Sequence, residues 1–187
     1  MTDVTTTATK QAKAIAAALA FASAAALAWS SFSSEWAHQL SYGHDTFGLR
    51  EWISCAEDGT LCESRSIASL ARFAKTDLFP TFGWICSVSM WLAALSLAGS
   101  AALMLAGRFI GRPIALTTVA LLALAVGLIS GFIFLATRPP ENYGPGPGFW
   151  AFAAGELVGI VATILVARIR PADPEWDDPE TFDEEKW

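Results

Sequence analysis

The sequence predicts an all-α integral membrane protein: a four-transmembrane-helix bundle with a small extracellular antiparallel β-sheet stapled by a disulfide. The chain has 187 residues, 53% of them hydrophobic and only 16% charged, against about 25% charged in typical soluble domains. Four long stretches are almost free of charge, and two cysteines lie close together in the longest polar segment between them. These observations together predict helices in lipid and a structured loop outside it.

Each of the four apolar stretches is long enough to cross a bilayer as a helix. A helix needs roughly 20 residues to cross about 30 Å of hydrocarbon, and in lipid each backbone polar group must be satisfied within its own segment. We therefore expect one membrane domain over residues 1–170, with helices at 14–32, 81–107, 114–137 and 149–167 and an outer loop at 33–80.

The first apolar stretch has two interpretations. Lys10 and Lys13 precede an alanine-rich run, and Ala26-Leu27-Ala28 resembles a signal-peptidase site. The run continues to Phe32 and is long for a signal peptide, so we favour a retained first helix. Cleavage would instead leave three helices and an N-terminus outside.

Basic residues near the helix ends predict that both termini are cytoplasmic, because such residues concentrate on the cytoplasmic side. The cysteine pair agrees with this orientation, since disulfides persist outside the cytosol. We expect an integral protein of a plasma membrane or a bacterial inner membrane. The basic clusters are Lys10 with Lys13, Arg108 with Arg112, and Arg168 with Arg170.

The outer loop contains a predicted β-hairpin. Asp58-Gly59 is a strong two-residue turn signal. A turn there places Cys55 directly opposite Cys62, where paired Cα atoms lie about 5.5 Å apart, within reach of a disulfide. The alternative is a flexible loop with two free thiols. Aromatic and β-branched residues nearby favour a small sheet; they are Phe47, Trp52, Ile53 and Ile67.

Small residues in the last two stretches predict close helix packing. Gly127 and Gly131 are four residues apart in the third stretch, and Gly155 and Gly159 have the same spacing in the fourth. This spacing lets helix backbones approach closely in lipid, so we expect the third helix to pack against the fourth. The connector before the fourth stretch contains Gly-Pro-Gly-Pro-Gly at 144–148, which we expect to form a stiff non-helical turn.

Glu156 is the one ionisable residue well inside a predicted helix. A charge at the membrane centre costs at least about 2.5–3.5 kcal/mol, so such residues face a partner or a water-filled cavity. We favour a neutral or hydrogen-bonded glutamate that reaches Ser, Thr or backbone groups on a neighbouring helix. A proton or cation path and a contact to another subunit are the alternatives.

The C-terminal segment 171–187 predicts an acidic disordered cytoplasmic tail, because eight acidic residues and one lysine cannot build a packed core. It is either a solvated tail or a docking peptide for a basic cytoplasmic partner. His38 and His44 lack the usual zinc-ligand spacing, so we expect no metal. We also expect no cofactor, no catalytic site and no nucleic-acid partner, since the corresponding motifs are missing from the sequence.

The outer loop resembles that of the claudin/PMP22 superfamily of four-helix membrane proteins. That family carries a tryptophan, a Gly-Leu-Trp-x-x-Cys motif and a second cysteine in its first outer loop. Here Arg50 and Glu51 interrupt the motif, and the chain ends in Lys186-Trp187 rather than Tyr-Val. The matching positions are Trp36, Gly48, Leu49, Trp52, Cys55 and Cys62, with Asn142-Tyr143-Gly144-Pro145 in the second outer loop.

The resemblance implies a left-handed four-helix bundle topped by a small antiparallel sheet, and a non-enzymatic role in lateral assembly, adhesion or modulation of a partner. We therefore expect a homo-oligomer or a complex with other membrane proteins, formed through the outer loop. Two other functions stay open. One is a small accessory subunit of a membrane redox or transport complex, and the other is proton or ion conduction through Glu156.

Overall fold

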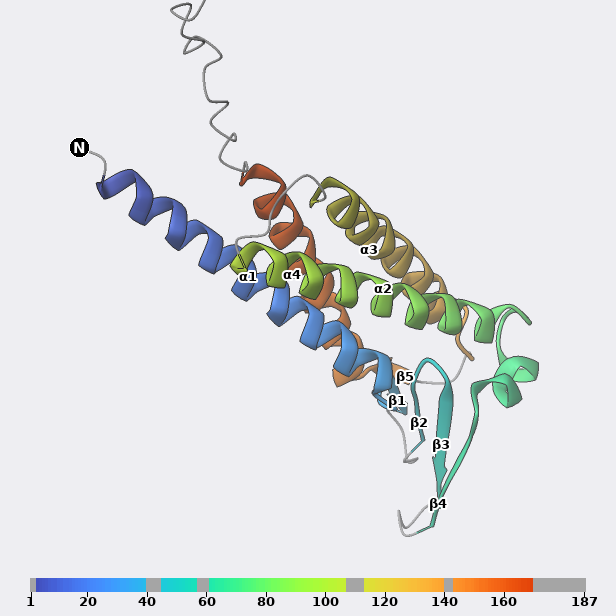
Figure 1. Cartoon of the computed structure of the whole chain (residues 1–187). Helices are drawn as coiled ribbons and strands as arrows, with labels where there is room; N and C mark the ends of the chain where they lie inside the picture. The colour runs from blue at the N-terminus through green and yellow to red at the C-terminus, as the bar shows by residue number, and fades with distance from the viewer. Residues whose placement is uncertain (1–2, 40–44, 57–60, 107–112, 140–142, 170–187) are drawn as a thin grey trace, which may run out of the picture.

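Four helices pack side by side and carry a small β-sheet at one end of the bundle (Figure 1). The computed structural model describes residues 3–39, 45–56, 61–106, 113–139 and 143–169. Within them, four helices are long and apolar enough to cross a membrane, which is the plan of an integral membrane protein. The helices are α1 (Asp3–Phe32), α2 (Phe79–Leu105), α3 (Pro113–Ala136) and α4 (Pro147–Arg168).

The sheet is antiparallel and draws its strands from both predicted outer loops. In the described residues it has five strands in the order β4-β3-β2-β1-β5. The first four come from the loop between α1 and α2, and the fifth comes from the connector between α3 and α4. The strands are β1 (Ala37–Gln39), β2 (Thr46–Phe47), β3 (Glu51–Cys55), β4 (Cys62–Ser66) and β5 (Tyr143–Pro145), and the short 3₁₀ helix η1 (Ile67–Phe73) follows β4.

The first helix is longer than the sequence predicted. Helices α2, α3 and α4 begin and end within one turn of the predicted stretches, whereas α1 begins at Asp3 rather than near residue 14. Ala8, Ala12 and the lysines and glutamine at 10, 11 and 13 are good helix formers and favour continuation of the helix on the N-terminal side of its apolar part. Val4 and the threonines at 5, 6, 7 and 9 are poorer helix formers.

The prediction for the connector before the fourth helix was wrong. The Gly-Pro-Gly-Pro-Gly run is not one stiff turn: Pro145 ends β5, Gly146 caps α4, and Pro147 is among the first helical residues of α4. Proline is tolerated there because the first turn has no use for its missing N–H. The small sheet is present, and Ile67 follows its strand β4 and begins η1, with the Oγ of Ser66 accepting a hydrogen bond from the Ala68 N–H at the cap.

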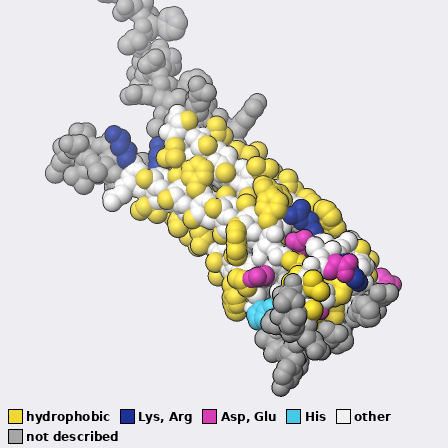
Figure 2. Space-filling view, turned by 90° about the horizontal axis from the view of Figure 1, so that it is seen from below, with side chains coloured by type: hydrophobic (Ala, Val, Ile, Leu, Met, Phe, Trp, Pro, Cys, Tyr) yellow, Lys and Arg dark blue, Asp and Glu magenta, His cyan; other side chains and the backbone are white. Residues whose placement is uncertain are grey.

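Small residues fill the inside of the bundle, while large apolar residues lie on its outside. The buried residues of α1 and α2 are mostly Ala, Ser and Gly. Exposed leucine, valine, isoleucine and tryptophan side chains cover the outside of the helices. Figure 2 shows hydrophobic side chains over the length of the bundle, with acidic side chains at the sheet end and basic ones at both ends. This arrangement suits lipid, where small residues let helices approach and apolar ones need no burial.

An aromatic cluster joins the sheet to the bundle. Phe79 of α2 stacks on Phe134 of α3 with ring centroids 4.5 Å apart. Phe47 of β2 packs edge-on against both rings, at 6.0 Å and 5.9 Å, and against Tyr143 of β5 at 5.1 Å. Edge-to-face aromatic pairs contribute about 0.5–1.5 kcal/mol each beyond burial. The cluster thus fixes the sheet on the end of the helices.

Candidate functional site

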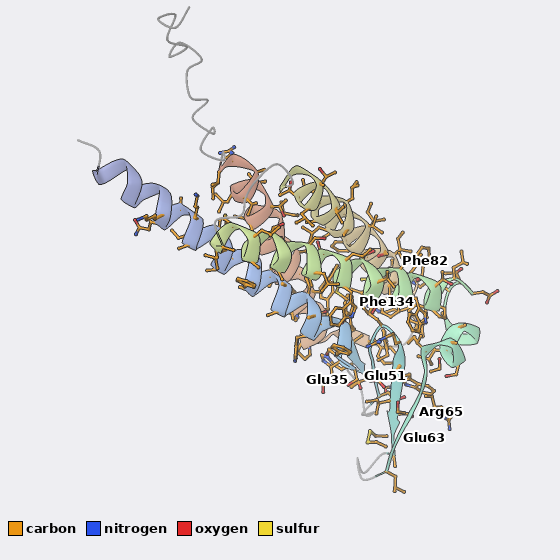
Figure 3. The ribbon with its side chains drawn as sticks, in the orientation of Figure 1. Glu35, Glu51, Glu63, Arg65, Phe82 and Phe134 are labelled. Carbon is orange, nitrogen blue, oxygen red and sulfur yellow. A yellow bond between two sulfur atoms is a disulfide. The ribbon has the colours of Figure 1, made fainter. Side chains whose placement is uncertain are left out.

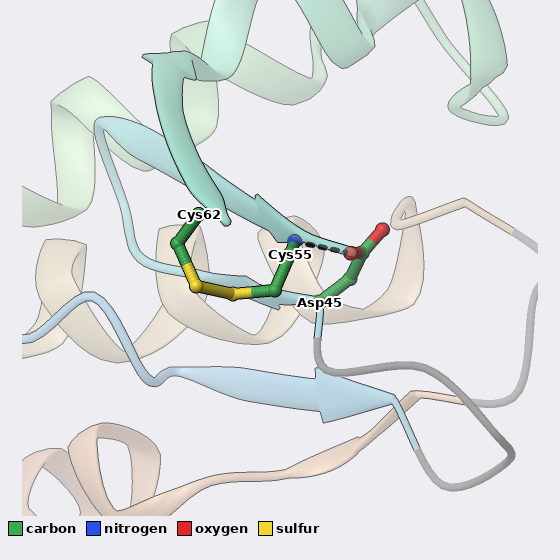
Figure 4. Close-up of a disulfide and its surroundings, with 3 residues drawn as sticks. All are labelled: Asp45, Cys55 and Cys62. Atoms are coloured by element: carbon green, nitrogen blue, oxygen red, sulfur yellow. Dashed lines mark hydrogen bonds between the residues drawn. A yellow bond between two sulfur atoms is a disulfide. The ribbon is translucent and has the colours of Figure 1, made fainter. Parts of the chain in front are cut away.

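The β3–β4 hairpin is closed by a disulfide between Cys55 and Cys62 (Figure 4), which confirms the predicted bond. The two residues are direct cross-strand partners with Cα atoms 4.0 Å apart. Asp45 supports the end of β3, because its Oδ1 accepts a hydrogen bond from the Cys55 N–H at 3.2 Å. The predicted turn residues Asp58 and Gly59 lie outside the described residues.

Strand β4 is the outermost strand of the sheet on the side far from β5. All five of its residues are exposed. Edge strands with open backbone groups are templates for pairing with another chain. The hairpin also projects beyond the bundle, with Glu63 and Arg65 along β4 (Figure 3). The geometry therefore makes β4 an accessible pairing surface.

Two opposite charges lie on one face of β4. Arg65 donates a hydrogen bond to Glu63 Oε2 at 2.5 Å, and this is the one ion pair within the described ranges. The hydrogen bond and the positive charge of Arg65 lower the pKa of Glu63 below its ordinary value of 4.5. The same contact raises the pKa of Arg65. Both groups therefore stay charged at neutral pH.

Trp52 lies beneath these charges on the neighbouring strand. It is the cross-strand partner of Arg65, and the Arg65 guanidinium carbon lies 5.9 Å from the centroid of its ring. The Trp52 Nε1 is buried and has no hydrogen-bond partner among the described residues. Of the claudin-like positions, Trp52 and Cys55 lie on β3 beside β4, and Cys62 lies on β4 itself.

Three further claudin-like positions, Trp36, Gly48 and Leu49, attach the sheet to the helices. Trp36 is fully buried and donates a hydrogen bond from Nε1 to the Ser30 carbonyl at 2.8 Å. Leu49 is also buried. A Cβ on Gly48 would collide with the backbone of Ser33 and Ser34, so only glycine permits that approach. These residues position the sheet rather than form its exposed surface.

Glu156 of α4 is fully buried between the helices, and neither carboxyl oxygen has a hydrogen-bond partner among the described residues. This corrects the prediction that it reaches a Ser, Thr or backbone group. Glu156 lies beside Gly127 of α3. A Cβ added to Gly127 would be 2.8 Å from Glu156 Oε1 and 3.6 Å from the Ser89 Cβ of α2. The Ser130 hydroxyl is bonded instead to the carbonyls of Val126 and Gly127.

The predicted glycine contact between the third and fourth helices was only partly right. Gly127 and Gly131 of α3 do face α4, but they face the side chains of Glu156 and Phe152. Gly155 faces Leu27 and Ala26 of α1, and Gly159 faces Ser23 of α1 and Leu124 of α3. The close partner of α4 is therefore α1, and the Ser23 hydroxyl confirms this by donating to the Gly155 carbonyl at 2.7 Å.

The histidines do not form a metal site in the part of the chain that the structure describes. His38 lies in β1, and His44 falls outside the described residues. Among the residues described, no group of three or more His, Cys, Asp or Glu side chains comes together. The acidic tail at 171–187 also falls outside them, so its role stays a prediction.

No protein-family model matches this chain, and no curated protein sequence matches it either. The claudin-like resemblance and the function that it implies therefore stay predictions. The fold and the geometry of β4 are the grounds on which a function can be argued.

Proposed function

We propose that this protein is a non-enzymatic, claudin-like membrane protein that assembles laterally with copies of itself through the edge of β4. The observation that carries the proposal is the exposed edge strand with its Glu63–Arg65 pair. The orientation proposed from the basic clusters places this strand outside the cytoplasm, where a disulfide persists. The rigid attachment of the sheet to the bundle holds the edge in a constant position.

The backbone of β4 alternates between inward and outward hydrogen bonding. In antiparallel pairs, residues that exchange hydrogen bonds alternate with residues that do not. The Ala56 N–H donates to the Leu61 carbonyl and the Ile67 N–H donates to the Arg50 carbonyl, so odd-numbered residues of β4 bond to β3. The backbone groups of Ser64 and Ser66 therefore face outward, toward a further strand.

Two copies of β4 match one another about Ser64. An antiparallel pairing in which Ser64 faces its own counterpart makes every outward-facing backbone residue a hydrogen-bonded partner. The same register places Glu63 opposite Arg65 of the second copy, and Arg65 opposite its Glu63. Opposite charges in direct cross-strand positions are favourable, and such a self-complementary patch is what a two-fold dimer requires. The sheets of the two copies would then form one continuous sheet across the dimer.

Charge exchange on β4 tests this pairing. Glu63→Arg places arginine opposite arginine across the interface, and Arg65→Glu places glutamate opposite glutamate. Each single variant should dissociate, whereas the double exchange Glu63→Arg/Arg65→Glu restores opposite charges and should assemble. Light scattering of the detergent-solubilised protein and chemical cross-linking in membranes measure the dimer.

Mixing the two single variants is the sharpest arm of the experiment. The Glu63→Arg chain carries two positive charges on β4 and the Arg65→Glu chain carries two negative ones, so together they should form a heterodimer. Glu35→Arg is the matched control, since Glu35 is exposed just before β1, three strands away from β4 in the sheet. Dimers that persist in both single variants, or a mixture that stays monomeric, would refute assembly through β4.

A further inference from the structure

A cavity of about 340 Å³ lies where α1 ends and the turn between β2 and β3 begins. This volume falls within the range of small-ligand sites, roughly 300–1,000 Å³. The lining combines hydroxyls, an aromatic ring and two opposite charges. It consists of Ser31, Phe32, Ser33, Leu49, Arg50 and Glu51.

The cavity lies at the boundary between the apolar bundle and the polar sheet. The apolar part of α1 ends at Phe32, whose side chain is 61% exposed, and Trp29 one turn earlier is 54% exposed. Exposed aromatic residues at helix ends mark the headgroup level of a bilayer. The cavity therefore opens at the level of the lipid headgroups. The exposed side chain of Phe32 lies between the cavity and the apolar surface of the helices.

Arg50 is held in the cavity by contacts that leave most of its donors unused. One Nη2 hydrogen bond goes to the Ser31 carbonyl at 3.3 Å, and the guanidinium carbon lies 5.3 Å from the centroid of the Phe32 ring. A guanidinium has five N–H donors in a rigid fork that suits phosphate. Arg50 is thus positioned to bind a phosphate at headgroup level.

Glu51 adds a negative charge to the same cavity. Its Oε2 accepts a hydrogen bond from the Ser64 hydroxyl at 3.2 Å. Because Glu63 and Arg65 form the one ion pair in the described segments, Arg50 and Glu51 form no ion pair with one another or with another described side chain. The cavity therefore presents one positive and one negative group, with neither neutralised by an ion pair.

We propose that this cavity binds the phosphoethanolamine headgroup of a glycerophospholipid from the leaflet on the sheet side. Arg50 binds the phosphate, Glu51 accepts hydrogen bonds from the primary ammonium, and Phe32 contacts the start of the chains. Charge-assisted hydrogen bonds of this kind are the stronger ones. A choline headgroup has no N–H to donate to Glu51, and a glycerol headgroup has no positive charge. The site should therefore select ethanolamine.

Binding of short-chain lipids to the detergent-solubilised protein tests the proposal. Dihexanoyl phosphatidylethanolamine, phosphatidylcholine and phosphatidylglycerol are titrated separately and followed by native mass spectrometry. We expect the ethanolamine lipid to bind at least about tenfold more tightly than the other two, as one charge-assisted hydrogen bond implies. Equal binding of all three lipids would overturn the assignment.

Two variants separate the roles of the charges. Arg50→Gln should weaken the binding of all three lipids. Glu51→Gln should lower the affinity for the ethanolamine lipid to that for the choline lipid and leave the affinities for the other two lipids unchanged. Arg65→Gln and Glu63→Gln are the matched controls, because they remove the same charges from β4 outside the cavity and should keep the selectivity. Full ethanolamine selectivity in Glu51→Gln would refute the site even if Arg50→Gln failed to fold.

Soluble phosphoethanolamine distinguishes a lipid from a free ligand with the same headgroup. It should compete only weakly with the lipid, because it lacks the chains that contact Phe32 and the apolar surface. Competition as strong as that of the short-chain lipid would show that the ligand is soluble and would overturn the lipid assignment.

Discussion

At the scale of single residues, Glu156 is the most unusual side chain in the bundle. A buried polar group costs free energy unless it is hydrogen-bonded, yet both oxygens of Glu156 have no partner among the described residues. Replacing an unpaired buried polar group by an apolar one of similar shape is nearly neutral or stabilising. We therefore expect an apolar replacement of Glu156 to stabilise the protein, whereas the same replacement of a hydrogen-bonded glutamate would destabilise it.

We predict that Glu156→Leu raises the stability of the detergent-solubilised protein, by about 1–3 kcal/mol, the usual penalty of one unsatisfied buried group. Glu156→Gln keeps a polar group of the same shape and should leave the stability close to that of the wild type. Thermal unfolding followed by tryptophan fluorescence measures both variants. A Glu156→Leu protein that melts well below the wild type would show that the carboxyl group has a structural partner.

Glu156 also provides a test of whether the protein conducts protons or cations. We predict that proteoliposomes show no proton or cation flux that depends on Glu156, because its side chain is fully buried and the described residues 14–32, 79–105, 113–136 and 147–167 contain no other Asp, Glu, His, Lys or Arg to relay a proton. Flux is measured with a pH-sensitive dye inside the vesicles. A flux present in the wild type and abolished by Glu156→Gln would favour conduction as the function.

At the scale of elements, the β3–β4 hairpin depends on its disulfide more than the helices do. The bond closes a short loop at the exposed tip of the hairpin, and a loop of this size is stabilised by roughly 2–3 kcal/mol in the chain-entropy model. The aromatic cluster of Phe47, Phe79 and Phe134 lies at the other end of the sheet and is independent of the bond.

We predict that the double substitution Cys55→Ser/Cys62→Ser frees the tip of the hairpin and leaves the bundle intact. Hydrogen exchange should accelerate in β3 and β4, and exchange in α2 and α4 should stay at the wild-type rate. Dimer formation should weaken, because the partner strand is no longer pre-ordered. Faster exchange throughout the helices would contradict the separation of hairpin and bundle.

Contacts between helices decide which glycines tolerate a side chain. A Cβ on Gly131 would lie 2.9 Å from Phe152, and one on Gly155 would lie 3.0 Å from Leu27, whereas a Cβ on Gly99 would have nothing within 4 Å. Overpacking a tight site costs about 1–3 kcal/mol. We predict that Gly131→Leu and Gly155→Leu lower the melting temperature in detergent, and that the control Gly99→Leu does not. Equal melting of all three variants would mean that the helices are loosely packed.

At the scale of the whole molecule, assembly through β4 should depend on pH and salt. The pKa of Glu63 is lowered in the folded protein from 4.5, so its contribution to the ion pair is present above that value and is lost as the pH falls through the lowered pKa. We predict that the dimer fraction is constant down to pH 4.5 and falls below it. Glu63→Gln should lack this step.

Salt is the second variable, because both charges are exposed. The Debye length falls from about 8 Å at physiological ionic strength to about 3 Å at 1 M. We predict that high salt weakens the wild-type dimer and has a much smaller effect on Glu63→Gln, as analytical ultracentrifugation in detergent can measure. A dimer that is insensitive to both salt and low pH would exclude the proposed Glu63–Arg65 contacts.

The two ends of the bundle should lie on opposite sides of the membrane. The start of α1 and the end of α4 both lie at the end of the bundle away from the sheet (Figure 1). We predict that reporter fusions place Thr5 and Glu180 in the cytoplasm and Glu57 outside. The mature protein should keep its first helix, because Leu27 and the Ser23 hydroxyl contact Gly155 of α4. A mature N-terminus near Trp29 would show that the first helix is a cleaved signal.

The sequence by itself determined the features that depend on residues close to one another along the chain. Uncharged stretches of about 20 residues predict helices in lipid without knowledge of their partners, and the four helices are present. The pairing of Cys55 with Cys62 could be predicted because a short turn leaves one register for the residues beside it, and the bond is present.

Only the tertiary structure decided the contacts between distant segments. Gly144 pairs with His38, and the three residues of β5, Tyr143-Gly144-Pro145, carry no strand signal of their own. The helices are apolar on every side, so no polar stripe shows which face meets which neighbour. Gly155 therefore faces α1 rather than α3, and Glu156 lies beside Gly127, because small-residue packing sets the rotation of each helix only when all four are together.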